Sequence, residues 1–218
     1  MKRYLIYYSV TKEIGSTFPQ CQDIMLPVHM DDPYFVGAYS WRVFDPKPIV
    51  PTLILHRRAK RTDLLSAVGP GLIFRLVVSP RMSDTLFQYT HAGIQRLEIP
   101  VKLPKGETLA YHLIDGYDCA YEFIDFSRTQ FIHSTESGEI QQPIEISSQY
   151  ELRKLMAASK YNEHILIHDI HLLDSAPDFF SLYCVVKYNA SFIISQRIKD
   201  ALDNAGITGV NYVPLEQV

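Results

Sequence analysis

The sequence predicts an α+β protein, built mostly of antiparallel sheet with a few capped helices and two repeated strand-helix-strand units. Short apolar runs rich in β-branched residues recur along the chain, and one pattern of strand, helix, turn and strand occurs twice. The chain has 218 residues, 47% of them hydrophobic, which is enough for a large core without disulfide or metal staples.

The repeated pattern lies at residues 77–86 and 193–202, which align without a gap. In each copy a strand-forming run is followed by a serine that can cap the free amides of a helix. Pro80 then occupies the first helical position of the first copy, where a missing amide N–H costs nothing. After a three-residue insertion in the first copy, the alignment places Gly93 and Gly206 just past the last helical residue.

Each copy also carries an arginine two residues after its capping serine, at Arg81 and Arg197. Either side chain could pair with a carboxylate or with a carbonyl of the neighbouring copy. Such units are structural first, so a helix-capping scaffold is the main interpretation. An arginine-based anion site is the alternative.

The remaining elements before the first helix follow from composition. Residues 4–9 predict a strand, and a loop-like region rich in proline, glycine and aspartate continues to about residue 50. We then expect a short strand over 52–56 and a short helix over 62–68, closed by the glycines and proline of 69–71. A strand over 72–78 leads into the first capped helix.

Between the two copies, alternating apolar residues predict strands over 97–101, 109–113, 120–125 and 131–133, as in an antiparallel meander. Residues 137–139 resemble the tip of a hairpin.

A helix is expected after this meander. Ser148 and Glu151 form a capping box that begins it, and it continues to about Ser159. Strands over 164–173 and 179–186 complete the prediction.

Charge and cysteine content limit the classes of protein. The formal net charge of −3 gives no overall attraction to nucleic acid or to an anionic membrane, and the basic run 56–61 fits a solvated loop or helix start. Three widely spaced cysteines, Cys21, Cys119 and Cys184, favour a reducing compartment over a disulfide framework. Neither a signal peptide nor a membrane-spanning stretch is recognisable, so we expect a cytoplasmic protein with no membrane or nucleic-acid partner.

Two groups of residues could carry chemistry. His164, His168 and His171 would share a face of a helix and could bind zinc, but their β-branched surroundings predict a strand that turns His171 to the other face. We therefore expect no metal site and no cofactor.

A thiol, an imidazole and two carboxylates also lie close together in sequence, at His112, Asp115, Asp118 and Cys119. Nearness in sequence does not make them converge, and no known catalytic motif occurs in the chain. A catalytic role for the protein is therefore not expected.

Fourteen tyrosines, eleven phenylalanines and one tryptophan favour either a large aromatic core or a protein-binding surface. Two loop-like stretches combine such rings with acidic side chains, and these are the candidate partner-binding residues. They are Asp31, Asp32, Tyr34, Tyr39, Trp41, Asp115, Tyr117, Asp118, Tyr121 and Glu122.

Three segments carry a resemblance to a known family: residues 192–210 around the second Ser-x-Arg unit, residues 111–131, and Pro177-Asp178-Phe179-Phe180. They resemble a bacterial family of immunity proteins from polymorphic toxin systems. The resemblance covers about residues 72–215. It implies an immunity-family α+β region over 71–218, with residues 1–70 as a variable N-terminal region packed on the same domain.

The resemblance implies a non-enzymatic cytoplasmic protein that binds a cognate toxin domain and occludes it. It offers no catalytic residues, and the unmatched N-terminal region is where specificity would lie. Two alternatives stay open: a hydrolase or modification-reversing enzyme using segment 164–171 or the region of His112 and Cys119, and a regulatory protein-binding module. The oligomeric state is not predicted.

Overall fold

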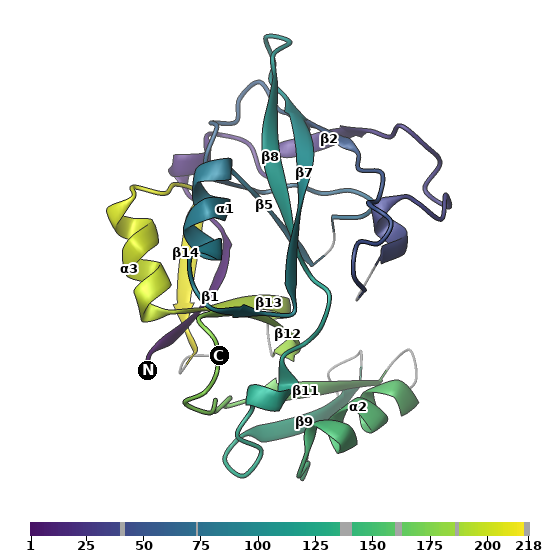
Figure 1. Cartoon of the computed structure of the whole chain (residues 1–218), viewed down its shortest axis with the longest axis vertical. Coiled ribbons are helices and arrows are strands. Elements are labelled where there is room, and N and C mark those ends of the chain that lie inside the picture. The colour runs from purple at the N-terminus through teal and green to yellow at the C-terminus, as the bar shows by residue number, and fades with distance from the viewer. Residues whose placement is uncertain (40–41, 73, 136–140, 160–162, 186–187, 216–218) are drawn as a thin grey trace.

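The computed structural model describes residues 1–39, 42–72, 74–135, 141–159, 163–185 and 188–215. Two sheets and three α-helices make up this part of the chain, which confirms the α+β class (Figure 1). The strands are β1 (Arg3–Tyr8), β2 (Cys21–Met25), β3 (Thr52–Leu55), β4 (Leu64–Leu65), β5 (Arg75–Val78), β6 (His91–Ala92), β7 (Ile94–Lys102), β8 (Thr108–Gly116), β9 (Gln130–Thr135), β10 (Gln141–Ile144), β11 (Glu163–His168), β12 (Phe179–Val185), β13 (Tyr188–Ser195) and β14 (Val210–Pro214). The helices are α1 (Pro80–Phe87), α2 (Gln149–Ala158) and α3 (Gln196–Asn204), with 3-10 turns η1 (Lys12–Ile14), η2 (Val36–Tyr39) and η3 (Tyr121–Phe123).

The first sheet has the strand order β10-β9-β11-β12-β13-β1-β14, with β6 added beside β12. The second has the order β2-β3-β7-β8-β5-β4. Most neighbouring strands are antiparallel, and the parallel pairs are β11 with β12, β6 with β12, and β3 with β7. The N-terminal residues contribute to both sheets, because β1 lies between β13 and β14 while β2 and β3 form one edge of the second sheet.

The apolar runs of the repeated units have a direct physical explanation. On β13, Ile194 packs in one buried cluster with α1 and α3, whereas its neighbour Ile193 packs in another cluster with α2. On β5, Val77 and Val78 likewise enter two different clusters. Successive side chains of a strand point to opposite faces, so these strands are covered on both faces and need apolar residues at every position.

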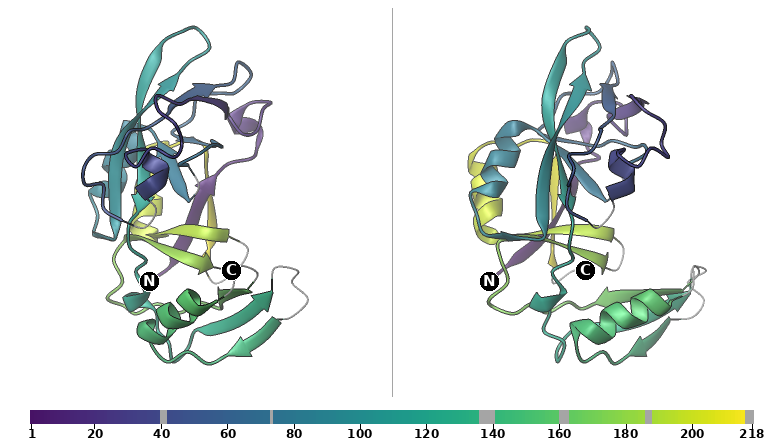
Figure 2. Two further views of the ribbon diagram at one scale, coloured as in Figure 1. Left: turned by 90° about the vertical axis from the view of Figure 1, so that its right-hand side faces the viewer. Right: turned by 45° about the vertical axis from the view of Figure 1, so that its right-hand side comes forward.

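The two helices of the repeated units lie side by side, although about 110 residues separate them in sequence (Figure 1, Figure 2). Both pack against the same cluster, in which Met82 and Leu86 of α1 meet Ile198 and Leu202 of α3, all four fully buried. Helix α2 lies apart from them, on β11 (Figure 2). No helix within the described ranges is long and apolar enough to cross a membrane.

Several local predictions hold. The serines Ser79, Ser148 and Ser195 each cap a helix, accepting a hydrogen bond from the amide three residues later. Gly206 follows the end of α3 with a positive φ, as predicted. Gly93 is different, because α1 ends at Phe87 and Gly93 lies between β6 and β7.

Three element predictions are wrong. Residues 62–68 form no helix, because Leu64 and Leu65 pair with β5 as strand β4. Residues 120–125 contain the 3-10 turn η3 instead of a strand, and the strand expected over 164–173 ends at His168, where Asp169 takes a positive φ of 46°. Trp41 and the expected hairpin tip at 137–139 lie outside the described residues.

Candidate functional site

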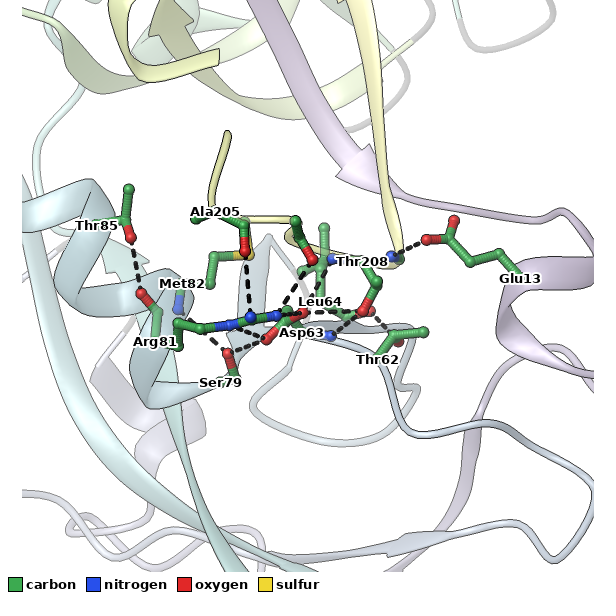
Figure 3. Close-up of polar contacts among 12 residues, drawn as sticks. Glu13, Thr62, Asp63, Leu64, Ser79, Arg81, Met82, Thr85, Ala205 and Thr208 are labelled. Atoms are coloured by element: carbon green, nitrogen blue, oxygen red, sulfur yellow. Dashed lines mark hydrogen bonds and ion pairs between the residues drawn. The ribbon is translucent and has the colours of Figure 1, made fainter. Parts of the chain in front are cut away.

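The first Ser-x-Arg unit surrounds a single buried carboxylate, that of Asp63 (Figure 3). The Ser79 hydroxyl donates to Asp63 Oδ1 over 2.7 Å, and Arg81 donates from Nε and Nη2 over 3.3 and 2.7 Å. Thr208 donates to Oδ2 from its amide and its hydroxyl over 3.0 and 2.9 Å. Burial raises the pKa of Asp63, but these hydrogen bonds outweigh it and hold the pKa below its ordinary value.

The second unit repeats the arrangement around Asp178. Arg197 donates from Nε and Nη2 to the two carboxylate oxygens over 3.2 and 2.6 Å, and the Thr90 hydroxyl donates to Oδ2 over 2.8 Å. Burial raises the pKa of Asp178, but hydrogen bonds from Ser195, Arg197 and Thr90 outweigh this effect and lower the pKa below its ordinary value. The predicted pairing of both arginines with carboxylates is confirmed.

The two units are crossed. Thr208, which follows α3, bonds to the aspartate that precedes α1, and Thr90, which follows α1, bonds to the aspartate that precedes α3. Arg81 also donates to the carbonyls of Ala205 and Gly206 beyond α3, over 3.2 and 3.3 Å. Each half of the repeat therefore completes the polar site of the other half.

This geometry corrects the register of the repeat. The structural equivalents are Thr90 and Thr208, so Gly93 does not correspond to Gly206. The Gly93 carbonyl instead accepts from the amides of Tyr117 and Asp118, and a Cβ at Gly93 would lie 2.4 Å from the Asp118 carbonyl oxygen. Close approach of backbone, rather than a helix end, accounts for this glycine.

The first predicted partner-binding stretch forms an exposed loop after β2. Met25, Met30 and Tyr34 are 52, 49 and 53% exposed. Residues 21–35 contain three aspartates and neither lysine nor arginine. We refer to six residues as the acidic loop surface: Met25, Leu26, Met30, Asp31, Asp32 and Tyr34.

Local hydrogen bonds hold the tip of this loop in one conformation. Asp32 Oδ1 accepts from the Tyr34 amide over 2.8 Å, and the Asp32 carbonyl accepts from the Phe35 amide over 2.9 Å. Phe35 is 1% exposed and packs in the core with Val36, while the Tyr34 carbonyl accepts from the amide of Ile49. The Tyr34 ring is thus exposed on backbone that is anchored on both sides.

Two predicted contact residues are buried instead. Asp115 accepts from Arg75 Nε over 2.6 Å and from Gln95 Nε2 over 2.7 Å, with both side chains of the ion pair almost inaccessible. Arg75 also donates to the carbonyl of Tyr39, whose side chain is 5% exposed. Asp115 and Tyr39 therefore join the η2 turn to the sheet and offer no contact surface.

The second predicted stretch also contains both buried and exposed residues. Tyr117, Asp118 and Tyr121 line a cavity of about 410 Å³ together with Arg153 of α2. Arg153 bonds to Asp118 over 2.9 Å and lies over the buried Tyr121 ring, 5.2 Å from its centroid. Tyr121 is thus a core residue, and Asp118 holds α2 in place although it is exposed. Glu122 is exposed.

The histidine segment does not form one group. His164 is exposed on β11, His168 ends this strand, and His171 lies beyond it with Nε2 3.7 Å from Asp169. His168 Nδ1 is buried and has no hydrogen-bond partner among the described residues. Within those residues no group of three histidine, cysteine or acidic side chains is placed to hold a metal ion.

The His112 region does not converge either. His112 and Asp115 are three residues apart on β8, so their side chains point to opposite faces of the sheet. Burial lowers the pKa of His112 and raises the pKa of the Cys119 thiol to about 11. Burial also raises the pKa of Cys21, to about 12. Both thiols are therefore almost fully protonated near neutral pH.

Sequence reasoning missed the apolar part of the acidic loop surface. Met25, Leu26 and Met30 carry no periodic pattern, and Pro27 interrupts their run. An apolar run in a region otherwise predicted to be loop was the available signal, because loop residues have little core to enter.

Comparison with known proteins adds no assignment: no protein-family model matches the chain, and no curated protein is significantly similar to it.

Proposed function

We propose that this protein is a cytoplasmic immunity protein of a bacterial toxin system, which binds a cognate toxin domain through the acidic loop surface and occludes its active site. The resemblance of residues 72–215 to such immunity proteins supports the proposal. So does the exposed, anchored loop in the N-terminal region, where the resemblance places specificity.

The observation that carries the proposal is the combination of exposed apolar and acidic groups on one fixed loop. Met25, Met30 and Tyr34 give apolar area, while Asp31 and Asp32 give negative charge. A loop whose backbone is already fixed loses little entropy on association, and an exposed aromatic ring is the usual kind of binding anchor. About 1,600 Å² of buried surface is typical for such complexes.

The chemistry of the surface defines the partner. With three aspartates and no lysine or arginine over residues 21–35, the surface complements a basic protein face. A toxin domain that acts on nucleic acid or nucleotides has such a face around its active site. Opposite charges also accelerate association, and salt reduces this acceleration.

The test is co-expression with the toxin domain encoded by the neighbouring gene. We expect the wild-type protein to restore growth and to co-purify with the toxin. The double variant Asp31→Lys/Asp32→Lys and the variant Tyr34→Ala should each lose protection, with affinity at least tenfold weaker, which corresponds to a loss of about 1.4 kcal/mol.

Matched controls lie far from this loop in sequence. Asp174→Lys places half of this charge change at an exposed aspartate, and Tyr150→Ala removes a ring that is 75% exposed on α2. Both should protect as the wild type does. Full protection by the acidic-loop variants would contradict the binding surface, and failure of the wild type to protect would contradict the function.

One observation favours an enzyme as the second candidate. His168 lines a groove of about 1040 Å³ together with Ser127, Ser147 and Glu151. Its Nδ1 atom is buried and lacks a hydrogen-bond partner among the described residues. If His168→Ala abolished protection while the complex with the toxin still formed, the enzyme would replace occlusion as the mechanism.

A further inference from the structure

A cavity of about 600 Å³ lies at the N-terminal end of α1, away from the acidic loop surface. Three chain segments supply most of its lining: residues 61–63, the Ser79-Pro80-Arg81 cap, and residues 109–111 of β8. Thr208 completes it from the other half of the repeat. Cavities of this volume are typical of small-molecule sites.

The charges around this cavity do not balance. Asp63 and Arg81 neutralise each other, and four of the five Arg81 donors are engaged by Asp63, Ala205 and Gly206. Arg61 is exposed and has no hydrogen bond or ion pair among the described residues. The wall therefore carries one free guanidinium and one spare N–H of a second.

The surroundings add to this positive charge. Arg57, Arg58 and Lys60 are exposed in the same segment and form no ion pair within the described part of the chain. Glu13 lies in a segment that contacts 58–60, and its carboxylate accepts from the Gly209 amide. The N-terminal end of α1 also favours an anion.

The rest of the lining is mixed, with polar Thr62 and Thr208 beside apolar side chains. Pro80, Leu109 and Ala110 face the cavity, and so does part of Tyr111, which is 3% exposed and donates its hydroxyl to the Thr62 carbonyl over 2.9 Å. Burial raises the pKa of Tyr111 to about 12, and the Arg61 charge opposes this shift. A ligand here would meet the Arg61 and Arg81 guanidinium groups together with apolar side chains.

We propose that this cavity binds a phosphomonoester that carries an apolar or aromatic body. A free guanidinium and a spare arginine N–H, with three further cations nearby, suit a dianionic phosphate better than a single carboxylate. The proposal does not depend on toxin binding, because the cavity lies outside the acidic loop surface.

Isothermal titration calorimetry tests this site with four probes at constant ionic strength: phenyl phosphate, adenosine monophosphate, inorganic phosphate and benzoate. We expect phenyl phosphate to saturate one site and to bind more tightly than inorganic phosphate or benzoate. Tighter binding of adenosine monophosphate than of phenyl phosphate would identify a nucleotide as the source of the phosphate, and the reverse order would identify a non-nucleotide ester.

Arg61→Gln should weaken phenyl phosphate binding about tenfold, as expected for the loss of a charged hydrogen bond. It should leave thermal stability unchanged because Arg61 supports no other residue. Arg58→Gln, a charge-matched control outside the lining, should change affinity less than about twofold. Equal affinities of phenyl phosphate and benzoate, unchanged binding by Arg61→Gln, or no saturation below about 10 mM would overturn the proposal.

Toxin protection separates this proposal from the proposed function. Arg61→Gln should protect cells fully, and Tyr34→Ala should bind phenyl phosphate normally. The two proposals can therefore fail independently.

Discussion

At the scale of single residues, Asp63 shows how one side chain joins distant parts of the chain. Its carboxylate accepts from Ser79, Arg81 and Thr208, the last of these 145 residues away. Asp63→Asn keeps the shape but removes the negative charge that these donors stabilise. We expect a loss of about 2 kcal/mol in the free energy of unfolding at pH 7, measured by urea denaturation.

The pH dependence of this loss of stability follows from the direction in which folding shifts the pKa of Asp63. The folded-state pKa of Asp63 lies below its ordinary value, so its contribution to stability is present above about pH 4 and is lost as the pH falls through the folded-state pKa. The difference between wild type and Asp63→Asn should therefore shrink between pH 7 and pH 3. A stability difference that grows on acidification would contradict the lowered pKa of Asp63 in the folded protein.

At the scale of elements, the three helix caps are not equivalent. Ser79 accepts from the Met82 amide and also donates to Asp63, whereas Ser148 accepts from the Glu151 amide and has no carboxylate partner of its own among the described residues. Ser79→Ala should lower the free energy of unfolding by about 2 kcal/mol and Ser148→Ala by about 1 kcal/mol. Thermal unfolding of both variants measures this difference, and an equal or reversed order would contradict the account of the cap.

The acidic loop surface also belongs to this scale, because its conformation depends on one buried neighbour. Phe35 is 1% exposed beside the exposed Tyr34. Phe35→Ala should lower stability by about 3 kcal/mol and weaken toxin binding without changing any exposed side chain. Toxin affinity that stays unchanged in a folded Phe35→Ala protein would show that loop anchoring does not matter.

At the scale of the whole molecule, the crossed repeat predicts coupling between residues far apart in sequence. A double-mutant cycle of Asp63→Asn with Thr208→Val should give an interaction energy of about 1 kcal/mol, whereas Asp63→Asn with Thr90→Val should be additive. Urea denaturation of the wild type, the three single variants and the two double variants supplies both cycles. Coupling of Asp63 to Thr90 instead of Thr208 would contradict the crossed arrangement.

Much of the fold was predictable because local chemistry dictates it. The capping serines, the Pro80 start of α1 and the alternating strands of the meander each follow from backbone hydrogen bonding or side-chain period. Residues 62–68 were mispredicted because their local preference is helical, and pairing of Leu64 and Leu65 with β5 outweighs that preference.

The candidate site was only half predictable. Asp31 and Tyr34 are exposed as expected, but Asp115 and Tyr39 carry the same acidic and aromatic character and are buried by Arg75 and Gln95. Local composition cannot distinguish the exposed residues from the buried ones, because burial depends on packing and hydrogen-bond partners that lie tens of residues away in sequence.

The sequence by itself determined the α+β class, the repeated Ser-x-Arg units and the pairing chemistry of their arginines, because each depends on neighbours within a few residues or on the valence of one side chain. Tertiary structure alone decided that the two units are crossed, which acidic and aromatic residues remain exposed, and that Arg61 and Arg81 share a cavity. Those features depend on which strands pair, and pairing is set by the free energy of burying whole faces of sheet and helix together.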